Sequence, residues 1–284
     1  MEFDFIKRSR PILRSLLKPH HWKYDSRGYC PSCDHNSLFL FSTPLHNGLS
    51  QIVADWKSTD KFKARLLKRE NYVCSLCDAN YRMRVHAASV LKLLNMSSTA
   101  DLVDKLKKDP HFRIYETAAY NIFRATALKK LPNYEVSEYF DDAAFGTYVS
   151  GIRNENLEHL TLADNTFDVV INSDVLEHVS DLGKALSEIK RVLKPGGFHV
   201  FTIPVDPELP QTVERAKMVD GKLVHLKEPV MHGDSIRNEG ILVFRDFGND
   251  ALDYMSIEGF SCKEIKHFRK DEFITSVYYA QKIC

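Results

Sequence analysis

Four of the six cysteines form two matching pairs, Cys30-Pro-Ser-Cys33 and Cys74-Ser-Leu-Cys77, with 40 residues between the pairs. A two-residue gap lets both sulfur atoms of a pair face one ion, and such pairs in an intracellular chain favour tetrahedral zinc over disulfides. Because four thiolates fill every coordination position, the ion would stabilise the fold and bind no substrate. The sequence therefore predicts a structural Zn²⁺ bound by all four residues, with a redox pair or free buried thiols as the alternatives.

Two histidines are candidates for the transfer of a proton. His232 lies in a Met-His-Gly-Asp turn whose glycine gives conformational freedom, and Asp234 could orient its imidazole while Arg237 binds an anion. His178 lies in a second polar stretch. Because histidine titrates near neutral pH, either residue could accept the proton of a hydroxyl group. The alternatives are an ordinary polar loop around His232 and helix capping or packing by His178.

The elements that would position these residues are clearest in the middle of the chain. Residues 167–172 are a short β-branched run after an Asp-Asn turn, which predicts a strand buried on both faces. Apolar residues recur at helical spacing over 181–194, and the Pro-Gly-Gly sequence at 195–197 turns the chain into a second strand over 198–203. This length is typical of a right-handed parallel crossover.

Three motifs in the same region resemble those of a known family. They are Asp-Asn-Thr-Phe-Asp at 164–168, Ser-Asp-Val-Leu-Glu-His-Val at 173–179 and Arg-Val-Leu-Lys-Pro-Gly-Gly at 191–197. In order and spacing they are similar to the middle and later motifs of class I S-adenosylmethionine-dependent methyltransferases, closest to the type 11 branch. The resemblance runs from about Arg113 to the C-terminus. It implies S-adenosylmethionine as the cofactor and an α/β fold, a Rossmann-like seven-stranded doubly wound methyltransferase sheet.

The resemblance also implies where the cofactor loop lies. The first strand, over 113–117, leads into this loop, and Glu116 matches the acidic position of the family. Thr117, Ala118 and Ala119 occupy the loop itself. The family usually has an acidic-x-Gly-x-Gly motif there, in which glycine lets the backbone approach the cofactor. This chain has no glycine in the loop, so an inactive methyltransferase-like protein is one alternative.

The remaining cofactor-binding candidates follow the ends of predicted strands. Glu138 comes about twenty residues after the loop and could accept hydrogen bonds from both ribose hydroxyls. Glu155 occupies the position of the family's acid beside the adenine amino group, and Asn156 could supply a backbone donor. Ser173 and Asp174 follow the 167–172 strand at its carboxyl end, where open α/β sheets bind ligands.

The remaining segments between residue 138 and the C-terminus are predicted from their length and composition. Between 138 and 155 there are too few residues for a helix plus a strand, which predicts a loop. Residues 205–245 form an insertion of the kind that often builds an acceptor pocket. A helix over 249–258 and strands over 261–268 and 273–282 are expected to close the domain, and the two remaining cysteines are interpreted as non-ligands.

The net charge of +1 hides a strong asymmetry. Residues 1–95 hold 16 Lys and Arg against 8 Asp and Glu, a net +8, whereas the remaining 23 basic and 30 acidic residues give −7. A basic third of this size suits an anionic partner such as RNA, an anionic glycan or a phosphorylated carrier. Thiolates bound to zinc would reduce the excess, and a solvated basic face is the alternative.

No apolar run approaches the roughly 18 to 20 residues that a membrane helix needs. The first 21 residues lack the uninterrupted apolar core of a signal peptide, so we expect a cytoplasmic protein. Their alternating apolar and basic residues predict a helix that docks on the protein itself, with a membrane-surface helix as the alternative.

We therefore expect a basic zinc-ribbon module with an N-terminal helix over 1–95, a linker helix over 96–112 and a methyltransferase domain over 113–284. Methyl transfer is an in-line displacement that needs positioning and, for a hydroxyl acceptor, a base. The expected reaction is metal-independent O- or N-methylation of a small molecule or sugar, as in surface-glycan or secondary metabolism. The alternatives are an RNA methyltransferase that uses the basic module and an inactive methyltransferase-like binding protein. The acceptor atom and the oligomeric state are not predicted.

Overall fold

The computed structural model describes residues 22–43, 50, 53–54, 58–119, 122–125, 127–233 and 240–283. The predicted N-terminal helix, Asp234, Arg237 and Cys284 lie outside these residues. No helix within the described ranges is long and apolar enough to cross a membrane.

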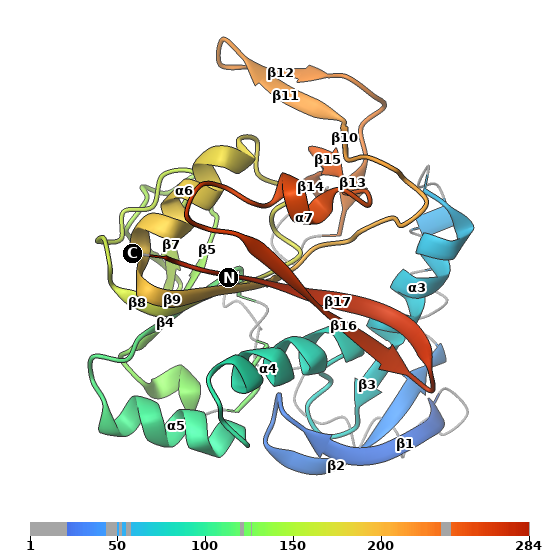
Figure 1. Cartoon of the computed structure of the whole chain (residues 1–284), viewed down its shortest axis with the longest axis vertical. Helices are drawn as coiled ribbons and strands as arrows, with labels where there is room; N and C mark the ends of the chain where they lie inside the picture. The colour runs from blue at the N-terminus through green and yellow to red at the C-terminus, as the bar shows by residue number, and fades with distance from the viewer. Residues whose placement is uncertain are drawn as a thin grey trace.

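The centre of the described chain is an eight-stranded sheet (Figure 1). Its strands, in spatial order, are β16 (Cys262–Arg269), β17 (Glu272–Gln281), β9 (Leu193–Thr202), β8 (Phe167–Ser173), β4 (Ile114–Thr117), β5 (Tyr134–Glu138), β7 (Ile152–Asn154) and β6 (Tyr148–Val149). The pairs from β7 through β5, β4 and β8 to β9 are parallel, whereas β17 runs antiparallel to both of its neighbours. The predicted Rossmann-like α/β fold is thereby confirmed.

The eighth strand comes from the segment that the sequence predicts to be a loop. Residues 148–154 form the β6–β7 hairpin, in which Ser150 and Gly151 have φ angles of 51° and 81°. Two consecutive positive φ angles are typical of the tight turn that matches the twist of a hairpin. The strands contain only two and three residues, too few to give an alternating pattern in the sequence.

The two faces of the sheet are covered by different helices. Helix α6 (Leu182–Val192) buries its apolar residues on one face together with Phe167 and Tyr115. Helices α4 (Tyr81–Leu93) and α5 (Thr99–Lys108) cover the opposite face and pack against Ile114, Val169 and Val200 (Figure 1). The middle of β8 is therefore buried on both sides, as its β-branched run predicts.

The predicted crossover is correct, but its boundary lies elsewhere. Helix α6 ends at Val192 and β9 begins at Leu193, so the Pro-Gly-Gly sequence lies within the strand and not before it. Gly196 has a φ of 81°, and the pairing register of β8 with β9 shifts here. A glycine at a positive φ accommodates such an irregularity without steric cost.

The described residues of the N-terminal part include a three-stranded antiparallel sheet and helix α3 (Asp60–Asn71). Strands β1 (Trp22–Cys30), β2 (His35–Ser42) and β3 (Tyr72–Cys74) form the sheet, and α3 lies between β2 and β3 in the sequence. Thr59 caps α3 by accepting a hydrogen bond from the amide of Phe62, which is the expected role of threonine at this position.

The insertion after β9 consists of short strands. They are β10 (Val213–Glu214), β11 (Ala216–Val219), β12 (Lys222–His225), β13 (Met231–His232), β14 (Ile241–Leu242) and β15 (Arg245–Asp246). The β11–β12 hairpin projects from the body, whereas β13 and β14 lie close to it (Figure 1). The predicted helix over 249–258 is only one turn long, α7 (Ala251–Tyr254), and a short 3₁₀ helix, η2 (Leu128–Lys130), precedes β5.

Candidate functional site

The four paired cysteines come together at the ends of β1 and β3. Sγ of Cys30 lies 3.9 Å from that of Cys77, Sγ of Cys33 lies 3.9 Å from that of Cys74, and all four sulfurs are within 4.8 Å of one another. A tetrahedral zinc with bonds of about 2.3 Å separates its sulfur ligands by about 3.8 Å. The arrangement therefore fits the predicted structural zinc.

Both cysteine pairs end in the same type of turn. Asp34 and Asp78, which follow the second cysteine of each pair, have φ angles of 65° and 60°. Their amides donate to the carbonyls of Cys30 and Cys74 at 2.9 and 3.0 Å. Aspartate adopts this left-handed conformation more readily than most residues, so the repeated Cys-x-x-Cys-Asp sequence was a signal of matching turns that sequence reasoning missed.

The first cysteine pair touches the segment that follows the cofactor loop. Ser32 is fully buried, and its hydroxyl donates to the carbonyl of Ile122. The Ser32 carbonyl accepts from the amides of Arg124 and Ala125 at 2.6 and 3.2 Å. Because Ser32 lies between two of the predicted zinc ligands, the predicted metal site contacts the segment that follows the predicted cofactor loop.

Two of the predicted acids hold the cofactor loop by its backbone. Glu116 is buried and accepts from the amide of Ile122 and the hydroxyl of Tyr134, both at 2.7 Å. Glu138 Oε2 accepts from the amide of Ala119 at 3.0 Å. Ala118 between them has a φ of 59°, a conformation that glycine adopts without strain and alanine does not. The loop thus has the backbone shape of a glycine turn without the glycine.

The two candidates for adenine binding already have partners within the protein. Glu155 accepts from Nε of Arg153 at 2.6 Å and from the amide and hydroxyl of Thr161 at 2.8 and 2.5 Å. The side-chain oxygen of Asn156 accepts from the amide of Glu158 at 2.9 Å. These contacts fix the turn after β7.

Ser173 and Asp174 join the carboxyl end of β8 to the N-terminal part. The Ser173 hydroxyl lies 2.8 Å from Nδ1 of His86 on α4. Asp174 forms ion pairs with Arg69 of α3 and Arg82 of α4, and the hydroxyl of Thr202 donates to it at 2.8 Å. Burial alone would raise the pKa of Asp174, but the two guanidinium groups lower it below the usual range. Asp174 is therefore an ionised docking residue.

The two candidate bases, which the sequence places in separate loops, form one cluster with Glu177. The rings of His178 and His232 are nearly perpendicular, with centroids 5.0 Å apart. Oε1 of Glu177 lies 3.7 Å from Nε2 of His178 and 3.9 Å from Nδ1 of His232. Burial raises the pKa of Glu177 well above its ordinary value, and the negative charge of Asp174 adds a smaller increase. Burial lowers the pKa of His232 to about 3, so its imidazole is neutral.

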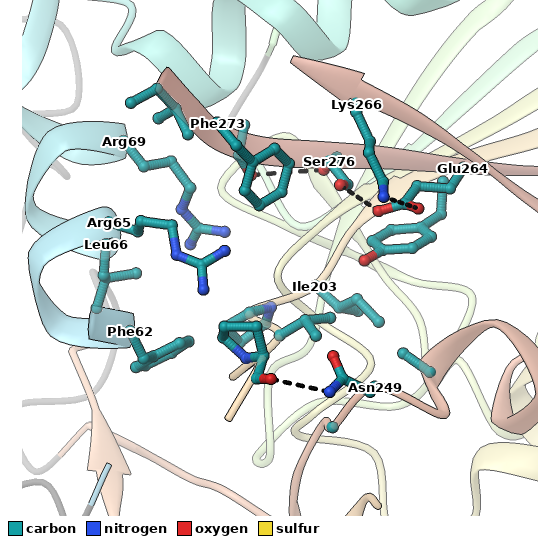
Figure 2. A pocket seen from close by; sticks show the side chains of 18 of the residues that line it. Phe62, Arg65, Leu66, Arg69, Ile203, Asn249, Glu264, Lys266, Phe273 and Ser276 are labelled. Carbon is teal, nitrogen blue, oxygen red and sulfur yellow. Dashed lines mark hydrogen bonds and ion pairs between the residues drawn. The ribbon is translucent and has the colours of Figure 1, made fainter. Parts of the chain in front are cut away.

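A cavity of about 410 Å³ lies between α3 and the last strands of the sheet (Figure 2). Its apolar wall includes Phe62, Ile203, Phe273 and Tyr278. Arg65 points into it, with its guanidinium 5.1 Å from the centre of the Phe273 ring, and within the described residues its buried Nε and Nη2 atoms have no hydrogen-bond partner. The predicted insertion contributes Val205 and Pro207 to the lining, and α3 contributes residues that the sequence does not predict there, because the position of this helix depends on long-range ion pairs.

Residues 118–201 match the family described as methyltransferase domain. The ubiquinone/menaquinone biosynthesis C-methyltransferase UbiE of Haemophilus ducreyi is 60% identical over 42 residues, which are 15% of this chain and 16% of that protein. The malonyl-[acyl-carrier protein] O-methyltransferase of Yersinia pestis is 34% identical over 67 residues, 24% of this chain and 25% of that protein. The chain thus spans at most about a quarter of the length of these two relatives.

Among solved structures, the amino pentose methyltransferase CalS10 of Micromonospora echinaspora, determined with S-adenosylmethionine bound, is 14% identical. It covers 64% of this chain and 89% of its own, with a TM-score of 0.37. The matched family segment begins in the cofactor loop and ends in β9, so it contains Ser173, Asp174, Glu177 and His178.

Proposed function

We propose that the chain is a class I methyltransferase that transfers a methyl group from S-adenosylmethionine to a small-molecule or sugar acceptor. The observation that carries the proposal is the match of residues 118–201 to the methyltransferase-domain family, on a sheet whose parallel strands end at the predicted cofactor loop. Open α/β sheets bind ligands beyond the carboxyl ends of such strands.

The cofactor would lie against the loop after β4 and the ends of β5 and β8. At this edge the hydroxyl oxygen of Thr117 is buried and, within the described residues, lacks a hydrogen-bond partner, as expected where a ligand completes the contacts. Glu138 accepts from the amides of Ala119 and Tyr139 with its two oxygens, and the same carboxylate would hold the ribose hydroxyls. The other candidates at this edge are Glu116, Glu155, Asn156 and Ser173. When bound, S-adenosylmethionine supplies the activated methyl group.

The cavity of Figure 2 favours a small acceptor over RNA. Its volume of about 410 Å³ lies within the range typical of small-molecule sites. Three of the sixteen basic residues of 1–95 are engaged inside the protein: Arg69 and Arg82 pair with Asp174 and Glu70, and Arg84 stacks on Phe39. These three arginines therefore do not contribute to a surface for a nucleic-acid backbone.

The acceptor's proton would be handled by the cluster of Glu177, His178 and His232. The cluster follows β8 directly, and Arg69 both lines the cavity and pairs with Asp174 of the same loop. A positioned histidine contributes typically 10²- to 10⁴-fold to the rate of transfer from a hydroxyl. The four-cysteine site, with all positions filled by sulfur, takes no part in the chemistry. O- or N-methylation without a role for this zinc is the reaction that we infer.

Calorimetric titration with S-adenosylmethionine tests the proposal. Hydrogen bonds to charged groups contribute about 1.5 to 3 kcal/mol, so Glu138→Ala should weaken binding about 10- to 100-fold. Glu135, on the same strand, accepts a hydrogen bond from the Tyr148 hydroxyl at 3.1 Å, and Glu135→Ala is the matched control that should bind normally. A wild-type chain that binds no S-adenosylmethionine would overturn the proposal in favour of an inactive methyltransferase-like protein.

A further inference from the structure

Glu177 is a buried carboxyl group for which the described residues provide no hydrogen-bond partner. The residue is fully buried, and within the described part of the chain neither of its side-chain oxygens accepts or donates a hydrogen bond. A buried polar group in this state costs about 1 to 3 kcal/mol, and more if it is charged. Protonation does not remove the cost, because a carboxylic acid also needs an acceptor for its proton. A ligand bound beside Glu177 would supply the partner that the described residues lack.

Both histidines face this carboxylate with nitrogen atoms suited to a metal ion. Nδ1 of His178 donates to the carbonyl of Leu242 at 2.8 Å, which places the proton on Nδ1 and the lone pair of the neutral ring on Nε2. Nε2 is the atom that lies 3.7 Å from Glu177. A ligand histidine whose other nitrogen donates to a carbonyl is the arrangement that metal sites use to fix ring orientation.

We propose that Glu177, His178 and His232 bind a divalent first-row metal ion such as Zn²⁺, separate from the four-cysteine site. The three ligand atoms lie within 4.8 Å of one another. Bonds of about 2.0 to 2.1 Å at a tetrahedral ion separate nitrogen and oxygen ligands by about 3.4 Å. The observed separations of 3.7 and 3.9 Å are slightly longer, and they close on the ion with small side-chain movements.

The cluster is held by a rigid frame. Arg245 donates at 2.8 Å to the carbonyls of Leu176 and Val179, which flank the proposed ligands Glu177 and His178 in the sequence. His232 pairs with Ile241 across β13 and β14. Gly240 approaches so closely that a Cβ atom there would lie 2.3 Å from the carbonyl oxygen of His232, so only glycine fits. These contacts position the ligands before any ion is bound, which lowers the cost of binding.

The ion pairs beside the cluster leave no excess positive charge that would repel a cation. Arg69 and Arg82 carry two positive charges, and Glu70 and Asp174 carry two negative ones. Two nitrogens and one carboxylate are ligands that suit zinc and neighbouring metals. Three protein ligands leave a position for water or for an oxygen of the acceptor, unlike the closed four-cysteine site. With an ion bound, the two imidazoles are ligands and do not accept the acceptor's proton, so the metal site and the histidine base are alternative states of this cluster.

Metal content of the full-length protein tests the site independently of methyl transfer. After expression in zinc-supplemented medium, wild type should contain two zinc ions per chain, and His178→Ala/His232→Ala should contain one. Glu177→Gln keeps the side-chain shape and should weaken the second Zn²⁺, measured by calorimetry with ZnCl₂, at least ~10-fold. His225→Ala, on the exposed β12 hairpin of the same insertion, is the matched control and should bind both ions.

Cobalt substitution identifies which site is filled. Co²⁺ at four thiolates gives intense sulfur-to-metal charge-transfer absorption, whereas Co²⁺ at two nitrogens and a carboxylate gives only weak visible bands, which should vanish in the double histidine variant. A wild-type chain that binds one metal ion with only the thiolate spectrum would overturn the inference. Titration of the same samples with S-adenosylmethionine shows separately whether the proposed function holds. Thermal unfolding of each variant distinguishes a lost ligand from a lost fold.

Discussion

Asp174 is a half-buried and Glu177 a fully buried carboxylic acid, three residues apart in the sequence, and their surroundings shift their pKa values in opposite directions. Asp174 faces Arg69 and Arg82, which keep it ionised despite burial. Glu177 is desolvated and lies near the charge of Asp174, which raises its pKa. The same residue chemistry therefore serves docking in one case and a candidate ligand site in the other.

Ala118 allows a test of the glycine-free cofactor loop. An alanine at positive φ costs about 1 to 2 kcal/mol, and glycine removes this strain while adding up to about 1 kcal/mol of unfolded-state entropy. Ala118→Gly should therefore be neutral or slightly stabilising in urea unfolding. Ala127, with a φ of −62°, is the matched control, and Ala127→Gly should destabilise by about 0.5 to 1 kcal/mol. Equal destabilisation by both variants would contradict the left-handed conformation of Ala118.

At the scale of elements, the long periodic segments were predictable and the contacts between distant ones were not. The strand and helix of the central crossover follow from a β-branched run and from apolar residues at helical spacing, since each pattern is local. The β6–β7 hairpin has too few residues to show a period. The contact of His178 with His232 depends on the folding of the insertion between them, and the cavity depends on the Arg69–Asp174 ion pair.

The contact of the first cysteine pair with the cofactor loop leads to a prediction at this scale. Ser32→Ala removes the hydrogen bond to the carbonyl of Ile122, and a neutral hydrogen bond contributes about 0.5 to 1.5 kcal/mol. Affinity for S-adenosylmethionine should fall about 2- to 10-fold while the zinc content stays unchanged. Ser75, in the second pair, contacts Ser37 within the N-terminal sheet, so Ser75→Ala should leave cofactor affinity unaltered. An equal loss of cofactor affinity in both variants would indicate that the substitutions destabilise the four-cysteine site in general. It would contradict a specific role of Ser32 in positioning the loop.

At the scale of the whole molecule, the N-terminal part and the sheet share buried polar contacts as well as apolar ones. The hydroxyl of Tyr81 donates to the carbonyl of Phe268 at 2.8 Å, and His86 on α4 lies fully buried between Ser173 and Val200. The predicted boundaries at 95, 112 and 113 remain predictions, but α4 packs on the same core as β4 and β8. Unfolding of α4 would therefore expose the sheet.

Buried histidines make the stability of this assembly dependent on pH. Burial lowers the pKa of His86 and of His199 to about 3, so both are neutral in the folded protein at pH 5. Their ordinary value in the unfolded chain is about 6.5. Between these limits the unfolded state binds more protons, so the stabilisation is complete above pH 6.5 and is lost as the pH falls towards 3. Each histidine should reduce the free energy of unfolding by about 1.4 kcal/mol per pH unit below 6.5.

Urea unfolding at pH 7, 6 and 5 measures how the free energy of unfolding depends on pH. A variant of His199 shows how much of this dependence comes from that residue. His199 stacks with Phe201 at 4.3 Å between ring centroids, and its Nδ1 has no hydrogen-bond partner in the described chain, so His199→Phe preserves the packing while removing a titrating group. The pH dependence of the free energy of unfolding should fall by the contribution of about one titrating group. At pH 5 the free energy of unfolding should rise relative to wild type by about 2 kcal/mol. His225→Ala, at an exposed position, should leave the pH dependence unchanged.

Ion pairs of Asp174 do not account for a loss of stability between pH 7 and 5, because a carboxylate with a lowered pKa weakens the fold only below about pH 4. If His199→Phe retained the full pH dependence, His199 would not be the buried neutral group that this argument requires.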